Sequence, residues 1–284
     1  MAGAPPSPAA AGGGSEPFLW SHPVSSYAQK VRIALRYKNI AFTFQTPRGG
    51  GSGIPAATDT EFSSGNPRVE MPMLVDGDVR IFDSTIILEY IEDKWPEPAL
   101  LPAAQADPAG RARARMIEDV CDTHYEAINW GLGEVNSFGR AEGPAAEKLA
   151  AQAEHQIGQV QKWLTEQLGG KEWFGGERFG WADLTVAVMV NRTASYGIRP
   201  EAGSALEKWF LRVGDVPAVK ETLQECNDVL KTPPPYKDIL KQGLLRRQYR
   251  DHRLEWMIKS GGIDVVLDGM EKNNIRFPWP DPLG

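Results

Sequence analysis

The strongest constraint on the fold is a hairpin signal in the first third of the chain, "MPMLVDGDVRIF". Two apolar runs flank Asp76-Gly77, the dipeptide that best tolerates the positive φ angles of a tight turn. A helix follows in "DSTIILEYIEDKW". Upstream, "PFLWSH" reads as a short buried strand, the next stretch as a helix with one mostly apolar face, and "NIAFTFQT" as a second strand. Residues 17–101 are therefore predicted to form β-α-β, a loop, and then β-β-α.

The chain changes character from Asp107 onward, where long helical patterns are separated by prolines and glycines. We predict an α/β domain over residues 17–101, a linker over 102–110 and an all-helical domain over 111–232. "KTPPPYKD" breaks the chain again, and residues 233–284 are expected to add one or two helices and an extended tail.

Charge and composition exclude several classes of function. The 284 residues carry a net charge of −6, which argues against a general nucleic-acid binder, because such proteins carry a basic face. The net charge does not exclude a local site for a small anion. The basic cluster of the C-terminal extension could bind an anionic ligand, and it consists of Arg246, Arg247, Arg250 and Arg253. A solvated or salt-bridged helix face is the more common role of such a cluster.

Two cysteines far apart and four scattered histidines form no metal-ligand pattern, and they suit a reducing compartment. Residues 1–16 are rich in Ala, Gly and Pro and lack the basic start and apolar run of a secretory signal, so they are expected to be a disordered tail. The longest wholly apolar stretches are too short to span a bilayer. We therefore expect a cytoplasmic protein with no membrane partner.

Two adjacent serines precede the first helix in "SHPVSSYAQKVRIAL". Ser25 and Ser26 are either ordinary helix caps or hydroxyl donors to a group bound at the helix start. A serine-hydrolase triad is not indicated, because no G-x-S-x-G occurs. The glycine-rich segment 47–67 lacks GxxxxGK[ST] and is read as a mobile loop rather than a phosphate-binding loop.

Three motifs, in this order, resemble the soluble glutathione transferases. "SSYAQKVRIAL" looks like the first-helix signature of the zeta and omega classes, "NPRVEMPMLVDGDVRIFDSTIILEYIEDKWPEPALLP" resembles the family's strand–turn–strand–helix segment, and "FGGERFGWADLTVA" resembles its helical-domain folding motif. The match covers roughly residues 17–230. It implies a thioredoxin-like α/β N-terminal domain, an all-α helical-bundle C-terminal domain, glutathione as co-substrate or cofactor, and a homodimer.

The resemblance also implies which residues bind glutathione. Pro72 matches the family's cis proline, and Met71 before it would pair its main chain with the cysteine part of glutathione. Ser84 reads as the cap of the next helix, whose free N–H groups would receive the γ-glutamyl carboxylate, while Asp83 would accept from the ammonium group. Glu70 departs from the family pattern, because Gln or Lys at that position holds the glycine end; Arg68 or a basic residue of the extension would then take this role.

The folding motif shows another departure. The family usually has Ser or Thr where this chain has Gly180, so the capping box with Asp183 keeps only one of its two side-chain hydrogen bonds. Gly at an N-cap costs only a few tenths of a kcal/mol relative to Ser. We expect Asp183 to be structural.

Ser25 falls on the position that activates glutathione in zeta-type members and that carries the catalytic cysteine in omega-type members. Because serine cannot form a mixed disulfide, it favours activation of the glutathione thiolate over thiol exchange. A free thiol has a pKa of about 8.5, and a hydroxyl donor at a helix N-terminus would lower it. Ser26 is the second choice for this role.

The second-substrate pocket of the family lies between the domains. Candidates on the first long helix are Glu118, Asp122 and Tyr125, with Trp130, Tyr196 and Trp209 as others, although helical spacing makes most of them core residues. The nine tryptophans suggest a bulky or aromatic electrophile. The predicted function is a serine-type glutathione transferase acting on such an electrophile. Alternatives are a glutathione-dependent cis–trans isomerase of a dedicated biosynthetic or catabolic pathway, and a non-catalytic binding or regulatory member, for which Glu70 is the best support.

Overall fold

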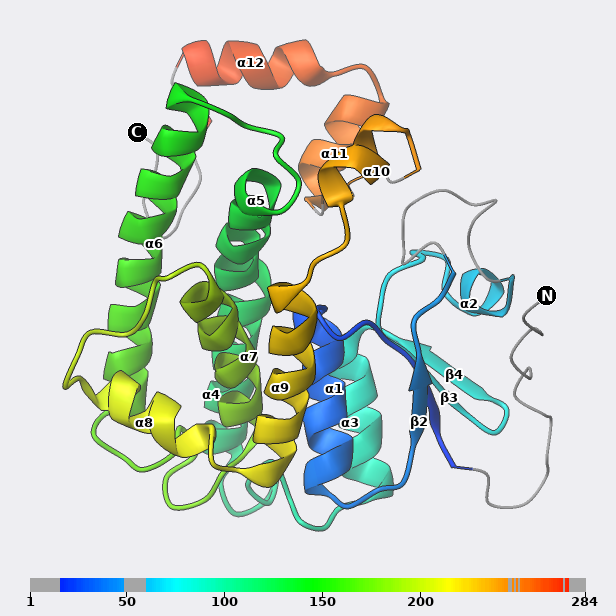
Figure 1. Ribbon diagram of the computed structural model, residues 1–284. Coiled ribbons are helices and arrows are strands. Elements are labelled where there is room, and N and C mark those ends of the chain that lie inside the picture. The colour runs from blue at the N-terminus through cyan, green and yellow to red at the C-terminus, as the bar shows by residue number, and fades with distance from the viewer. Residues whose placement is uncertain are drawn as a thin grey trace.

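A four-stranded sheet with two helices on one face forms the N-terminal domain (Figure 1). The structure, a computed structural model, describes residues 16–48, 60–244, 247, 249, 251–272 and 274–275. The strands are β1 (Phe18–Trp20), β2 (Thr43–Gln45), β3 (Met73–Asp76) and β4 (Val79–Phe82), in the spatial order β2-β1-β3-β4. β1 and β2 are parallel, whereas the other two pairs are antiparallel. The predicted thioredoxin-like fold is confirmed.

The predicted hairpin forms the β3–β4 pair. Asp76 pairs with Val79, and Gly77 in the turn has a φ of 58°, the left-handed conformation that glycine tolerates best. α1 (Ser26–Tyr37) and α3 (Ser84–Lys94) pack against each other and lie between the sheet and the C-terminal domain (Figure 1).

The segment predicted to be a loop between β2 and β3 contains a short helix, α2 (Thr60–Gly65). Phe62 is its one buried residue and packs against Trp20, with 5.7 Å between the ring centroids. A six-residue helix held by one apolar side chain leaves no periodic signal, which explains why the sequence did not indicate it. The glycine-rich part of this segment and the tail at residues 1–15 lie outside the described residues.

The C-terminal domain is helical, as predicted. Its elements are α4 (Pro108–Val120), a π-helical turn η2 (Cys121–Tyr125), α5 (Glu126–Asn136), α6 (Pro144–Leu168), α7 (Trp181–Ser195), α8 (Ala205–Val213) and α9 (Pro217–Lys231). α4 begins inside the predicted linker, where Asp107 caps it by accepting a hydrogen bond from the Gly110 N–H at 2.8 Å.

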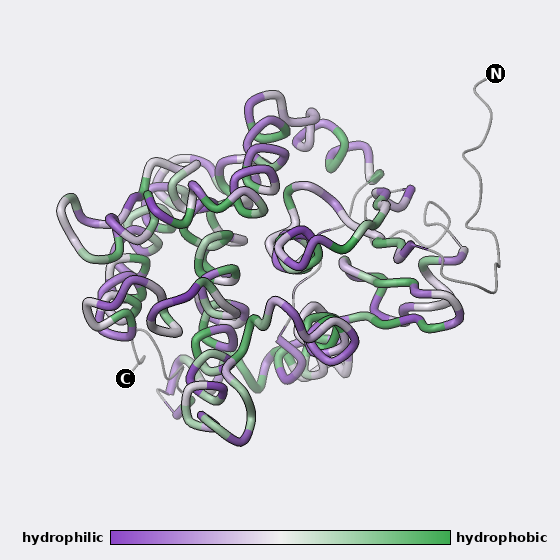
Figure 2. Tube along the Cα trace, turned by 90° about the horizontal axis from the view of Figure 1, so that it is seen from below, coloured by the Kyte–Doolittle hydropathy of each residue, from purple (hydrophilic) through white to green (hydrophobic). Residues whose placement is uncertain are grey.

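α7 is the central helix of this domain, because nearly all of its side chains are buried. It contacts α1 in the other domain as well as α4, α8 and α9. Figure 2 shows hydrophobic and hydrophilic residues alternating around most other helices, as expected for helices with one buried face. In the part of the chain that the structure describes, no helix is long and apolar enough to cross a membrane.

The C-terminal extension forms α10 (Tyr236–Lys241), α11 (His252–Lys259) and α12 (Ile263–Glu271). It lies at the end of the molecule where α1 begins and α5 and α9 end (Figure 1). The sequence is compatible with two roles for this extension, which are covering the second-substrate pocket and packing on the back of the fold as reinforcement.

One arginine of the extension anchors it to α5. The Arg247 guanidinium lies 3.8 Å from the Phe138 ring centroid and 4.5 Å from that of Trp130, and it forms an ion pair with Glu134. We call Trp130, Glu134, Phe138 and Arg247 the clasp. Arg247 is thus a salt-bridged residue, Arg253 is exposed, and Arg246 and Arg250 lie outside the described residues.

Candidate active site

Three predicted site segments leave the sheet at the same edge. In the register of the sheet, Trp20 at the end of β1 pairs with Met73 at the start of β3, and Met73 also pairs with Phe82 at the end of β4. The turn after β1, the residues before β3 and the residues after β4 therefore meet. The turn after β1 contains Ser25, the residues before β3 are Met71-Pro72, and the residues after β4 are Asp83-Ser84. The topology therefore brings together three segments that the sequence identified separately.

Ser25 is the N-cap of α1. Its hydroxyl oxygen accepts a hydrogen bond from the Ala28 N–H at 3.3 Å, and its side chain is half-buried. Ser26 is the first helical residue and is only 1% exposed, and its hydroxyl has no hydrogen-bond partner among the described residues. The two adjacent serines therefore differ sharply: Ser25 caps the helix at its surface, and Ser26 points into the interior.

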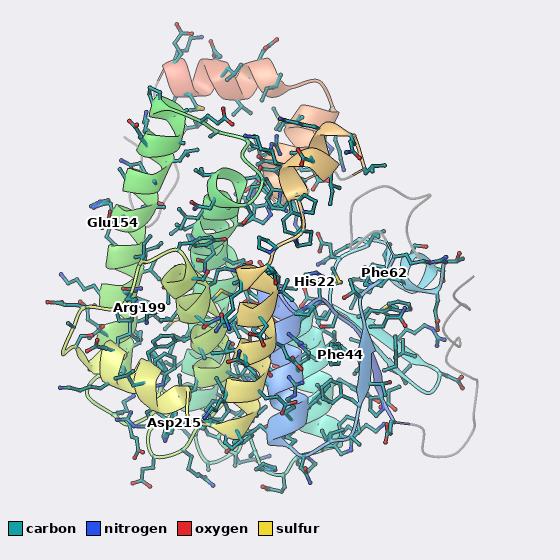
Figure 3. All side chains as sticks on the ribbon, viewed as in Figure 1. His22, Phe44, Phe62, Glu154, Arg199 and Asp215 are labelled. Carbon is teal, nitrogen blue, oxygen red and sulfur yellow. The ribbon has the colours of Figure 1, made fainter. Side chains whose placement is uncertain are left out.

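His22 lies in the same turn, and the sequence did not single it out. Its Nδ1 accepts a hydrogen bond from the Val24 N–H at 3.1 Å. Burial, together with the positive charges of Arg32 and Arg192, lowers the pKa of His22 from 6.5 to about 4. The imidazole is thus neutral near pH 7 and acts as an acceptor that shapes the turn. Figure 3 shows His22 on the side of the molecule from which α10 and α11 project.

Both carbonyl groups that precede Ser25 are held by side chains. The Pro23 carbonyl accepts hydrogen bonds from Gln29 Nε2 at 2.9 Å and from Arg32 Nη2 at 3.1 Å. The Val24 carbonyl accepts a hydrogen bond from Arg192, which belongs to α7 of the other domain. The position of Ser25 consequently depends on both domains.

The Met71–Pro72 peptide bond is cis, as the resemblance implied. Pro72 is buried, while Met71 and Glu70 are half-buried. Asn66, which is fully buried, shapes the preceding turn: its Nδ2 donates to the Glu70 carbonyl at 2.5 Å, and its Oδ1 accepts from the Arg68 N–H at 3.1 Å. The sequence did not single out Asn66.

The start of α3 differs from the prediction in one respect. Asp83, rather than Ser84, is the N-cap, with a φ of 77° and a carboxylate that accepts from the N–H groups of Thr85 at 3.0 Å and Ile86 at 3.4 Å. Ser84 is the first helical residue and is buried. Arg68 Nη1 lies 3.4 Å from Asp83 Oδ2, so Arg68 stands beside Asp83.

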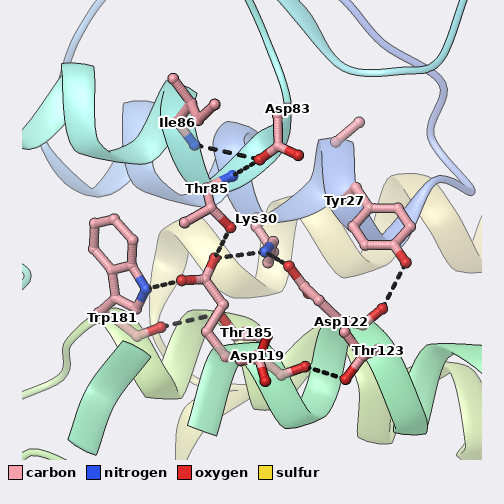
Figure 4. Close-up of polar contacts among 12 residues, drawn as sticks. Tyr27, Lys30, Asp83, Thr85, Ile86, Asp119, Asp122, Thr123, Trp181 and Thr185 are labelled. Carbon is pink, nitrogen blue, oxygen red and sulfur yellow. Dashed lines mark hydrogen bonds and ion pairs between the residues drawn. The ribbon is translucent and has the colours of Figure 1, made fainter. Parts of the chain in front are cut away.

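A buried ion cluster joins the two domains behind these segments (Figure 4). Lys30 Nζ of α1 lies 2.6 Å from Glu118 Oε1 and also contacts Asp122 Oδ2. Glu118 accepts further hydrogen bonds from Thr85 Oγ1 at 3.0 Å and from Trp181 Nε1. Burial opposes the charge of Lys30, but Asp122 and Glu118 outweigh it and raise the lysine pKa to about 12.

These contacts correct two of the second-substrate candidates. Glu118 is 2% exposed and fully engaged with Lys30, Thr85 and Trp181. Tyr125 is fully buried, and its hydroxyl lies 3.0 Å from Thr193 Oγ1. Both are core residues that link helices, because each polar group is satisfied inside the protein.

Asp122 occupies a different environment on the π-helical turn η2. Its side chain is 15% exposed, and its Oδ1 has no hydrogen-bond partner among the described residues. The Tyr27 hydroxyl donates to its main-chain carbonyl at 2.7 Å. Burial raises the pKa of Asp122 to about 7 against the opposing effect of Lys30. Of the three candidates on this helix, Asp122 is the one that reaches the surface.

Asp183 anchors the start of α7, in agreement with the structural role expected for it. Its carboxylate accepts from the N–H groups of Phe174 at 3.1 Å and Gly180 at 3.0 Å, and from Trp209 Nε1 at 2.7 Å. Burial raises its pKa to about 7, and these donors oppose that shift. Trp209, another pocket candidate, is fully buried and donates this hydrogen bond from the core.

Comparison with known proteins identifies the family. Residues 19–99 match the glutathione S-transferase N-terminal domain, and residues 130–217 match the glutathione S-transferase C-terminal domain. The chain belongs to the glutathione transferase superfamily. Glutathione is the co-substrate that this family binds, and the two matched regions correspond to the sheet-containing and helical domains described above.

Individual relatives are distant but cover most of the chain. Glutathione S-transferase U28 of Arabidopsis thaliana is 26% identical over 78% of this chain and 91% of its own length. Maleylacetoacetate isomerase of Pseudomonas aeruginosa is 27% identical over 76% of this chain and 98% of its own length. The crystal structure of rice GST1 in complex with glutathione has a TM-score of 0.66 at 26% identity, covering 80% of this chain and 97% of that one.

Proposed function

We propose that the protein is a glutathione transferase in which the Ser25 hydroxyl donates a hydrogen bond to the glutathione thiolate and prepares it for addition to a bulky electrophile. The observation that carries this proposal is the contrast between the two serines. Ser25 Oγ accepts the Ala28 N–H, and a hydroxyl that accepts one hydrogen bond still has its own hydrogen to donate. Ser26 is buried and turned away from solvent.

The residues around Ser25 fit glutathione. The N-terminus of α3 at Ser84 offers partial positive charge to a carboxylate, which suits the γ-glutamyl end. Asp83 and Arg68 stand beside it as groups of opposite charge for the ammonium and carboxylate. Met71 lies two residues before Met73, the first residue of β3, and this supports main-chain pairing with the cysteine part. Asp122 is the one candidate on the first long helix that we retain for the second-substrate pocket, and we propose a homodimer.

A cis–trans isomerase is the second candidate function. Maleylacetoacetate isomerase of Pseudomonas aeruginosa aligns over 98% of its length with this chain, which favours this alternative. Both reactions begin with addition of the thiolate to the substrate and differ in whether the thiolate leaves again. An assay of aryl halides beside maleyl-type cis-alkenes separates them: turnover of many aryl halides supports the transferase, and turnover of the alkenes alone supports the isomerase.

The proposed role of Ser25 is tested with Ser25→Ala and Ser26→Ala. Calorimetry gives the affinity for glutathione, and the ultraviolet absorbance of the thiolate gives the pKa of the bound thiol. We expect Ser25→Ala to keep the affinity, raise the thiol pKa by about one to two units, at about 1.4 kcal/mol per unit, and lower turnover. Ser26→Ala is the matched control and should change neither the affinity, nor the thiol pKa, nor turnover.

Two outcomes would contradict the proposal. Turnover of Ser25→Ala equal to that of the wild type would show that Ser25 does not have the proposed role. If the protein binds no glutathione at millimolar concentration, it does not have the proposed enzyme function.

A further inference from the structure

Arg192 is a cation of the helical domain that reaches the turn carrying Ser25. It lies in the last turn of α7 and is half-buried. Its Nη2 donates a hydrogen bond to the carbonyl of Val24, the residue directly before Ser25. Among the described residues, Arg192 forms no ion pair with a carboxylate. Arg32 and Arg36 of α1, in contrast, both pair with Glu225.

The charge of Arg192 acts on groups from several elements that meet here. It helps lower the pKa of His22 in the turn, and it opposes the rise that burial causes in the pKa of Tyr196 after α7, of Cys226 on α9 and of Tyr236 on α10. At Tyr196 and Cys226 the negative charge of Glu126 opposes that of Arg192. At His22, in the turn before α1, the charges that lower the pKa are the positive ones of Arg32 and Arg192. The turn that carries Ser25 therefore lies in a positive potential that Arg192 helps to create.

An anion bound at this turn would gain from both properties. A hydrogen bond to the Val24 carbonyl fixes the main chain from which Ser25 projects, and a partly desolvated charge interacts with an anion more strongly than an exposed one does. The anion formed at Ser25 in the proposed function is the glutathione thiolate.

We propose that Arg192 is a positioning residue for thiolate activation, which holds the Val24 carbonyl so that the Ser25 hydroxyl faces the sulfur and adds positive potential at the same point. This inference rests on the proposed function. In this proposal the N-terminal domain binds glutathione, and the helical domain contributes to its activation through Arg192. Arg192 thus belongs to the same helical domain as Asp122, the residue retained for the second-substrate pocket.

The test compares Arg192→Met, which removes the charge and the donor, with Arg192→Lys, which keeps the charge. Arg199→Met is the matched control, because Arg199 is exposed just beyond the same helix. Each variant is measured as the full chain for the pKa of bound glutathione, the dissociation constant of glutathione, and turnover of an aryl halide. We expect Arg192→Met to raise the thiol pKa by about one unit and lower turnover about tenfold at pH 6.5, with a dissociation constant within about twofold.

Arg192→Lys should recover at least half of the shift, and Arg199→Met should behave as the wild type. An unchanged thiol pKa in Arg192→Met, or a shift of the same size in Arg192→Lys, would overturn the inference. If Arg192→Met does not fold, Arg192→Gln replaces it under the same criteria. Ser25→Ala is measured in parallel: if it alone changes the thiol pKa, the role of Arg192 fails and the proposed function stands, and if Ser25→Ala also has no effect, the proposed function itself fails.

Discussion

Lys30 of the N-terminal domain and Glu118 of the helical domain form a salt bridge of 2.6 Å in which both side chains are almost completely buried. Trp181, Thr85 and Asp122 complete the cluster. Breaking a buried pair by removing one partner leaves an uncompensated charge in the interior, which is strongly destabilising. This pair therefore holds the two domains in the relative position that the site requires.

Lys30→Met is expected to lower the free energy of unfolding by about 3–5 kcal/mol, because Glu118 and Asp122 would remain buried without their cation. Urea denaturation followed by circular dichroism measures the change. Lys220→Met, at an exposed position of α9, is the control and should change stability by less than about 0.5 kcal/mol. Equal stability of the two variants would show that the cluster contributes little.

His22 gives stability a specific dependence on pH. Its pKa is about 4 in the folded protein and 6.5 in its ordinary state, so between these values the unfolded chain binds a proton that the native protein does not. The contribution of neutral His22 is complete above pH 6.5 and is lost as the pH falls toward 4. Wild-type protein should therefore lose more stability between pH 7 and pH 5 than His22→Asn, whose Oδ1 still accepts the Val24 N–H.

Thermal melts at pH 7, 6 and 5 test this difference. The exposed histidine His155 on α6 provides the control, and His155→Asn should follow the wild-type curve. Parallel curves for the wild type and His22→Asn would contradict the buried neutral state of His22.

Gly180 has no room for a side chain, although the family usually has Ser or Thr at this position. A Cβ at this position would lie 2.7 Å from the Leu100 carbonyl oxygen, which itself accepts the Trp181 N–H at 2.8 Å. Gly180→Ala should therefore destabilise the protein by about 1–3 kcal/mol through this clash.

Gly158→Ala adds the same methyl group at an exposed position inside α6, where a Cβ would meet nothing within 4 Å. It should stabilise the protein by about 0.5–1 kcal/mol, because alanine is the better helix former. The two variants are compared by urea denaturation, and changes of the same sign would reject the explanation given for Gly180.

The clasp should keep the C-terminal extension attached. Glu134→Gln removes the charge that pairs with Arg247 and with Arg140, the latter at 3.0 Å, and we expect faster tryptic cleavage between residues 233 and 260 with little loss of stability in the two domains. Glu142→Gln, which breaks an exposed pair with Lys237, should have no such effect, since exposed pairs contribute little. Mass spectrometry follows the rate of cleavage in both variants. Equal rates would mean that the clasp does not hold the extension.

Local signals in the sequence were sufficient for most of the architecture. The Asp76-Gly77 turn between two apolar runs produced the β3–β4 hairpin, and the long helical patterns after Asp107 produced the helical domain, because both depend on residues near one another in the chain. The short helix α2 and the capping of α3 by Asp83 were not predicted. Phe62 acquires its role through a contact with the sheet, which a local pattern does not encode. Asp83 and Ser84 are both good N-cap types, and the backbone conformation selects Asp83.

For the candidate site, the sequence by itself determined the residue types: two serines before a helix, a proline before a strand and an aspartate before another helix. Only the tertiary structure decided that Ser26 is buried while Ser25 reaches the surface, and that Glu118 and Tyr125 belong to the core. It also revealed His22, Asn66 and Arg192, whose partners in the fold are backbone groups. The physical reason is that burial and hydrogen bonding between α1 and α7 depend on packing across 168 positions of sequence, which a linear pattern does not record.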